Sequence, residues 1–163
     1  MTEGSDEANA VEALRGRIRL AFPDMVFSGR ITPADGETGE EFDEEQALYG
    51  ALHGKKWSEI PSSFIKSYSY SIPLLTEEAF GIFLPAWLSG SLDDREVRRA
   101  VVYAFSPHSR DEDTSFMNRR VQPLSGPQKE AIRAFLAHSL DVESSKFVQD
   151  HARRALEYVS TFC

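Results

Sequence analysis

The sequence predicts a mostly α-helical protein, a single compact domain of roughly six helices with two long loops at about residues 23–40 and 107–124. Apolar side chains recur every three to four positions along most of the chain, which is the spacing of one helix face. Residues that favour helix starts stand before these stripes, and no run of about four to eight β-branched residues indicates a strand. We expect residues 1–5 to be disordered and residues 6–163 to form the domain.

The first predicted helix covers residues 7–22 and ends before Pro23, which cannot continue a helix. Its buried face has helical spacing and comprises Val11, Leu14, Ile18, Ala21 and Phe22. Glycine and proline residues then interrupt the chain over residues 23–40. We expect a loop there, with one short extended piece at residues 25–31.

A second helix is predicted after this loop. Asp43, with Gln46 three residues later, has the spacing of a capping box and predicts a helix that runs to Leu52. Trp57 follows in a turn, where we expect its ring to enter the core. A further short helix is predicted over residues 62–68.

The clearest helix signal follows Thr76, whose hydroxyl can cap a helix over residues 77–89. The apolar face of this helix comprises Phe80, Phe83, Leu84, Trp87 and Leu88. Pro85 lies inside the pattern, and we expect it to kink or split the helix because it removes one backbone hydrogen bond.

Three more helices are predicted toward the C-terminus. Ser91 and Asp93 can cap the first, which ends before the second loop. After that loop, Ser125 and Gln128 have the spacing of a capping box. Ser144 is expected to open the last helix.

The chain is acidic, with 26 Asp and Glu against 18 Lys and Arg, a formal net charge of −8 and a pI near 5.0. Such a surface repels phosphates and anionic lipid, which argues against nucleic acid or membrane as partner and favours a basic protein. No stretch approaches the roughly 18 apolar residues of a membrane span, and the first residues lack a secretory pattern. The single cysteine, Cys163, allows no intramolecular disulfide, so we expect a cytoplasmic protein.

Seven carboxylates lie within eleven residues, at Asp35, Glu37, Glu40, Glu41, Asp43, Glu44 and Glu45. Their offsets do not match a calcium-binding loop, and we expect no metal and no cofactor. Carboxylates at a helix start also favour the positive end of the helix dipole, which accounts for some of them. As a surface, the same seven residues are a candidate site for a basic partner.

A second candidate site consists of two histidines and two arginines. His53, His108, Arg119 and Arg120 could bind a small ligand between helices, with residues 107–124 acting as a lid. The histidines lack metal-ligand spacing, and no nucleophile elbow or phosphate-binding loop is present. The competing interpretation gives these side chains structural or surface roles.

A wider group of cationic side chains could gather into a phosphate or carboxylate site. It comprises Arg95, Arg98, Arg99, Arg110, Arg119, Arg120, Lys129 and Arg133. The competing interpretation is scattered surface charge, paired with the acids Asp93, Asp94, Glu96 and Glu130.

Several motifs resemble a family of small, uncharacterised, mainly bacterial proteins known only as a domain of unknown function. The motifs are Trp57-x-x-Ile60-Pro61, Leu75-Thr76-Glu-Glu-Ala79-Phe80, Phe83-Leu84-Pro85-Ala86-Trp87-Leu88, Leu124-Ser125-x-x-Gln128-x-x-Ala131-Ile132-x-x-Phe135-Leu136 and Ala155-Leu-x-Tyr158. The resemblance covers roughly residues 10–160. It implies a single helical domain and supplies no catalytic residues.

Two functions remain open from the sequence. The first is a non-catalytic, cytosolic protein-interaction module, with an immunity-type inhibitor of a basic toxin as one specific form. The alternative is a small enzyme or small-molecule binder whose site lies between helices near residues 107–124. The oligomeric state is left open.

Overall fold

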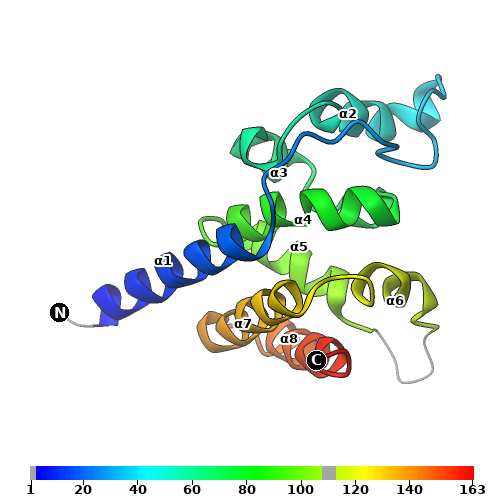
Figure 1. Cartoon of the computed structure of the whole chain (residues 1–163). Coiled ribbons are helices and arrows are strands. Elements are labelled where there is room, and N and C mark those ends of the chain that lie inside the picture. Colours follow the sequence, from blue (N-terminus) through cyan, green and yellow to red (C-terminus); the bar gives the residue numbers. More distant parts are fainter. Residues whose placement is uncertain (1–2, 108–112) are drawn as a thin grey trace.

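A computed structural model describes residues 3–107 and 113–163. Within these ranges the chain forms eight α-helices and no strand, which confirms the predicted class with more helices than the expected six (Figure 1). The helices are α1 (Glu3–Ala21), α2 (Asp43–Leu52), α3 (Ser62–Ser67), α4 (Glu77–Ser91), α5 (Arg95–Phe105), α6 (Ser115–Val121), α7 (Gly126–Val142) and α8 (Lys146–Ser160). Three single-turn 3-10 helices join them: η1 (Glu40–Phe42), η2 (Trp57–Glu59) and η3 (Ile72–Leu74).

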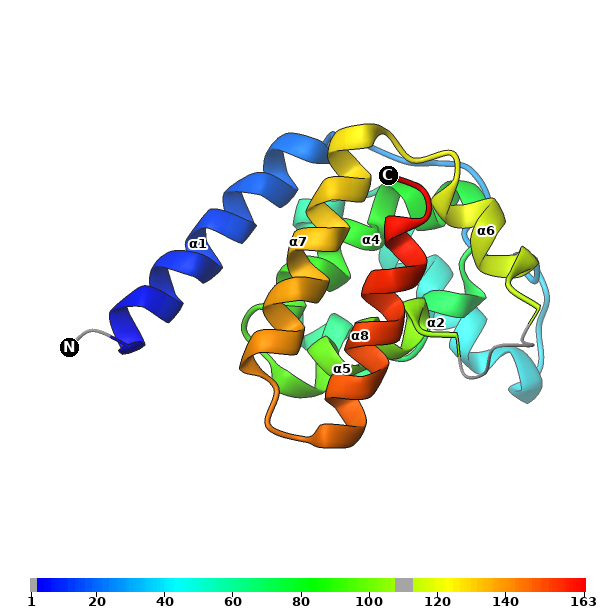
Figure 2. The same ribbon diagram turned by 90° about the horizontal axis from the view of Figure 1, so that it is seen from below.

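Helix α4 lies at the centre of the molecule and packs against α5, α1, α3 and α6. Helices α2 and α3 lie on one side of α4. On the other side, α5 packs against α4, and the antiparallel pair α7 and α8 packs against α5 (Figure 1). Helix α1 contacts α4 and α7 along its C-terminal half, and its N-terminal half projects from the body (Figure 2). None of the described helices combines the length and apolar character that a membrane crossing requires.

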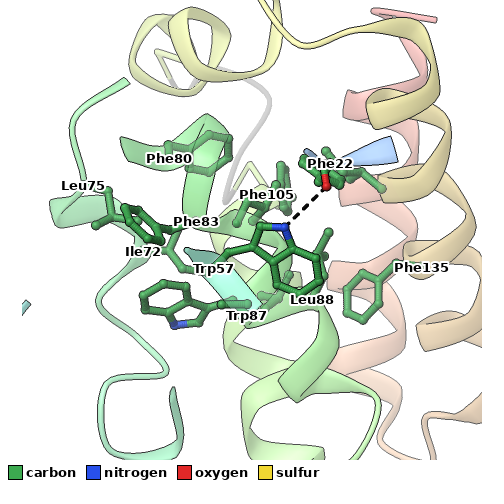
Figure 3. Close-up of a cluster of buried hydrophobic side chains, with 14 of the residues drawn as sticks. Phe22, Trp57, Ile72, Leu75, Phe80, Phe83, Trp87, Leu88, Phe105 and Phe135 are labelled. Carbon is green, nitrogen blue, oxygen red and sulfur yellow. Dashed lines mark hydrogen bonds between the residues drawn. The ribbon is translucent and has the colours of Figure 1, made fainter. Parts of the chain in front are cut away.

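The core is built around the aromatic face of α4 (Figure 3). Trp87 is fully buried, and its Nε1 donates to the carbonyl of Tyr68 at 3.1 Å. Trp57, which is 7% exposed, donates its Nε1 to the carbonyl of Phe22 at 3.4 Å. The prediction that both tryptophans belong to the core is therefore confirmed, and each buried indole N–H has a partner.

Thr76 caps α4 as predicted, with its Oγ1 accepting from the backbone N–H of Ala79 at 3.1 Å. The same hydroxyl donates to the carbonyl of Arg30 at 2.8 Å, and the Thr76 N–H donates to the carbonyl of Ile31 at 2.9 Å. Thr76 thus fastens the first loop to the central helix. Pro85 does not split α4, because buried contacts on both sides of it outweigh one missing hydrogen bond.

Helix α1 begins earlier than predicted, at Glu3 instead of residue 7. The expected extended piece at residues 25–31 is limited to one antiparallel bridge between Phe27 and Lys55. The second long loop, predicted over residues 107–124, contains helix α6. That helix has only seven residues and too short a stripe to be recognised by its periodicity.

The capping predictions are confirmed in part. Ser125 and Gln128 form the expected capping box at the start of α7. The cap of α5 is Asp94, one residue after Asp93, and the cap of α8 is Ser145. In both places two adjacent residues can cap, and local sequence does not choose between them.

The capping box predicted at Asp43 is wrong. The 3-10 turn η1 runs directly into α2, so that Asp43 is the first helical residue and its side chain makes no capping hydrogen bond. Gln46 instead donates its Nε2 to the carbonyl of Glu37 at 2.9 Å.

Candidate functional site

The seven predicted carboxylates lie on one continuous piece of chain, residues 35–45, which we call the acidic segment. It runs from a turn through η1 into the first turn of α2. Gly36 and Gly39 have φ angles of 91° and 123°, which favour glycine and allow the chain to reverse there. The segment therefore displays its carboxylates on a defined turn and helix start.

Hydrogen bonds hold the beginning of the acidic segment. The carboxylate of Asp35 accepts from the backbone N–H of Ile31 at 2.7 Å and from that of Thr32 at 2.9 Å. Gln46, the residue that follows the segment, donates its side-chain amide N–H to the carbonyl of Glu37. The Asp35 carboxylate is therefore engaged in hydrogen bonds that hold the loop, although it was predicted to bind a partner.

Most of the other carboxylates face solvent. Glu44 accepts a hydrogen bond from the hydroxyl of Ser71, and Glu45 is half-buried. The remaining four are exposed and have no ion-pair partner within the described part of the chain: Glu37, Glu40, Glu41 and Asp43. The acidic segment contains no Lys or Arg, so that 19 acidic and 18 basic side chains are left for the rest of the sequence. Almost the whole net charge of −8 therefore lies in this segment.

A pocket of about 740 Å³ separates the loop at residues 28–39 from α2. Its α2 wall includes Glu45, Tyr49 and His53, and its loop wall includes Asp35 and Glu37. The rings of Tyr49 and His53 stack with centroids 4.6 Å apart and an interplanar angle of 20°. Three of the predicted partner-binding carboxylates thus share one pocket with a histidine that was predicted for the alternative ligand site.

The other residues of the alternative site lie elsewhere. His108 lies outside the described residues. Arg119 is exposed on α6 and pairs with Glu77 at 3.1 Å, and neither Arg119 nor Arg120 lines the pocket that contains His53. The described members of that predicted set therefore do not form a common site.

Arg120 has a structural role. It is 6% exposed, and its two terminal nitrogens donate to the carbonyls of Phe116 and Leu75, both at 2.9 Å. Its guanidinium also lies 3.6 Å from the centroid of the Phe116 ring. Burial lowers the pKa of Arg120. The side chain joins α6 to the chain just before α4.

The structure reveals a buried ionic cluster that was not predicted. Glu143 follows α7 and is 3% exposed, and its carboxylate accepts from Arg99 at 2.7 and 3.2 Å and from Arg98 at 3.1 Å. Hydrogen bonds from the Arg99 side chain, the Ser145 backbone and Arg98 lower the pKa of Glu143 to about 2. Because 44 or 45 residues separate the partners, no local pattern could have identified them. Arg98 and Arg99 are therefore held by Glu143 and do not form an open phosphate site.

Among residues 3–107 and 113–163, no group of three or more His, Cys, Asp and Glu side chains has the arrangement to hold a metal ion. The acidic segment is an open, negatively charged surface beside a pocket. Four of its seven carboxylates, those of residues 37, 40, 41 and 43, are exposed and unpaired in the described part of the chain, an arrangement that suits contact with a positively charged macromolecule.

Comparisons with known proteins agree with the resemblance inferred from the motifs. No curated protein and no solved structure matches this chain. One family model matches residues 10–160, which include all eight helices in whole or in part. Its description assigns no function, so the match carries no activity and no residue roles to the chain. The chain belongs to the family of unknown function DUF6714.

Proposed function

We propose that this protein is a non-catalytic interaction module that binds a basic segment of another protein through the acidic segment. The observation that carries this proposal is the concentration of nearly all the net charge in residues 35–45. Charges of one sign on one face attract an oppositely charged partner over a Debye length of about 8 Å at physiological salt. They also raise association rates by roughly 10- to 1,000-fold at low salt.

The neighbouring pocket adds a contact that surface charge alone lacks. Tyr49 is 41% exposed and stacks on His53, and Glu37 and Glu45 line the same pocket. A Lys or Arg side chain of the partner would lie against the Tyr49 ring with its charge near these two carboxylates. Such a cation–π contact contributes about 0.5–1 kcal/mol at an exposed site.

An immunity-type inhibitor is the specific form that we favour, because its carboxylates would cover the basic active site of a toxin. Charge complementarity of this kind provides fast association and suppresses wrong partners. A cytoplasmic location is part of the proposal, since the single cysteine is compatible with a reducing compartment. Nucleic acid is a poor partner for this surface, because its phosphates carry the same sign of charge.

The proposal is tested with an octa-arginine peptide as the basic probe and isothermal titration calorimetry at low and physiological salt. The test variant removes four exposed carboxylates of the acidic segment: Glu37→Gln, Glu40→Gln, Glu41→Gln and Asp43→Asn. Exposed charge pairs contribute about 0.3–0.5 kcal/mol each, so we expect the variant to bind about tenfold more weakly at low salt.

The matched control removes the same amount of charge from exposed positions elsewhere: Asp6→Asn, Glu7→Gln, Asp141→Asn and Glu157→Gln. It should retain most of the affinity, and nuclear magnetic resonance shifts caused by the peptide should cluster at residues 35–53. If the control loses as much affinity as the test variant, general acidity and not this surface binds the probe, and the proposal fails.

A further inference from the structure

A second pocket, of about 300 Å³, lies between the C-terminus of α5, the start of α6 and the last turns of α8. Its walls are largely apolar and include Phe105, Phe116 and Met117, with Tyr103 and Pro73 at the side. Phe105 is 1% exposed, whereas Phe116 is 42% exposed. The described walls of the pocket therefore range from a buried floor at Phe105 to an exposed side chain at Phe116.

Residues outside the pocket contact the side chains that line it and fix their positions. The rings of Tyr103 and His151 pack edge to face, with centroids 5.1 Å apart. Ser106, which lines the pocket and is 4% exposed, shares a hydrogen bond of 2.8 Å with Nδ1 of His151. The guanidinium of Arg120 covers one face of the Phe116 ring. Side chains fixed in this way lose little conformational freedom when a ligand binds.

The polar groups of the pocket set its preference for charge. Asp113 is the single charged side chain among the described residues that line it. Hydrogen bonds from the Ser115 side chain and backbone lower the pKa of Asp113, so that it is ionised at neutral pH. Burial raises the pKa of Tyr158 to about 12, and its neutral hydroxyl donates to Oδ1 of Asn118 at 2.6 Å. Among the described residues that line it, the pocket thus pairs an apolar interior with one carboxylate, that of Asp113, at its edge.

We propose that this pocket binds a small arylalkylamine, with the ring against Phe105 and Met117 and the ammonium group beside Asp113. A volume of about 300 Å³ is at the small end of the range for ligand pockets, which suits a molecule of about ten non-hydrogen atoms. The ammonium group of the ligand pairs with the Asp113 carboxylate, and its ring buries the apolar side chains of the pocket wall away from water. This site is separate from the acidic segment and does not depend on the function proposed above.

Three phenyl compounds that differ in the charge of the terminal group separate the contributions of ring and charge: 2-phenylethylamine, 2-phenylethanol and phenylacetate. Binding is measured by ligand titration with nuclear magnetic resonance detection of the protein. We expect millimolar or tighter binding of the amine, about fivefold weaker binding of the alcohol and no detectable binding of the carboxylate. Equal affinity for the amine and the alcohol would overturn the proposed charge recognition.

Two variants test the residues. Asp113→Asn keeps an oxygen that can accept from Ser115, and it should lower the affinity for the amine to that for the alcohol without changing the latter. Asp141→Asn, which removes the same charge from an exposed position on α7, should change neither affinity.

Met117→Trp fills the pocket and should abolish binding of both the amine and the alcohol. Circular dichroism checks that each variant is folded, and the Asp113→Asn comparison decides the question by itself if Met117→Trp does not fold. Amine binding that is unaffected by Asp113→Asn, or absent from the unmodified protein, refutes the proposal.

Discussion

Replacement of Glu143 by glutamine removes the negative charge that holds Arg98 and Arg99, while the side chain keeps nearly the same shape. The Glu143 side chain is 1% exposed, so solvent screens the interaction little. Its pKa is about 2 in the folded protein against an ordinary value of 4.5. At about 1.4 kcal/mol per pKa unit, we expect Glu143→Gln to lower the free energy of unfolding by about 3 kcal/mol at pH 7.

The pH dependence gives the sharper test. Because the pKa of Glu143 is lower in the folded than in the unfolded protein, the carboxylate stabilises the fold fully above the ordinary value of 4.5. This contribution is lost as the pH falls from 4.5 toward about 2. The difference in unfolding free energy between the unmodified protein and the variant should therefore be constant from neutral pH to about pH 5 and shrink below that.

Urea unfolding, followed by the fluorescence of Trp57 and Trp87, measures this difference at each pH. Asp150→Asn is the control, because Asp150 forms an exposed pair with Arg153 and should change the unfolding free energy by less than about 0.5 kcal/mol. A Glu143→Gln difference that stays the same from pH 7 to pH 3 would show that packing, and not the ionic cluster, causes the loss.

Two further predictions concern α4. Trp87→Ala should lower the free energy of unfolding by about 3–5 kcal/mol, because it empties a fully buried site and leaves the Tyr68 carbonyl without its donor; an unchanged denaturation midpoint would contradict this. Thr76→Ala should cost about 1–2 kcal/mol, since the hydroxyl caps α4 and also donates to the Arg30 carbonyl. Thr76→Ser keeps both hydrogen bonds and should recover most of that loss in the same thermal or urea unfolding measurement.

Local patterns predicted several elements whose stabilising contacts are themselves local, although the capping box at Asp43 was wrong. The stripe of α4, its Thr76 cap and the capping box at Ser125 all depend on residues within two turns of one another. Helix α6 depends on a contact that is distant in the sequence, because Arg120 within its seven residues donates to the carbonyl of Leu75. Such a helix depends on tertiary contacts more than on its own sequence.

The same limit applies to the candidate sites. The acidic segment was visible in the sequence because its carboxylates are neighbours along the chain. The pocket that His53 and Glu37 both line depends on how the loop returns to α2, and the pairing of Arg99 with Glu143 depends on how α5 meets the end of α7. The sequence pattern does not distinguish a charged residue that pairs inside the fold from one that faces solvent, because the partner is distant in the sequence.

Thr76 connects the first loop to the central helix, and this has a consequence for any binding at residues 35–45. Its hydroxyl and backbone N–H hold the carbonyls of Arg30 and Ile31, and Asp35 closes the turn that follows. Fixing a residue of free chain costs about 1–2 kcal/mol of conformational entropy. Folding has already ordered residues 30–35, so a protein that binds the carboxylates next to them has less conformational entropy to remove from this part of the loop.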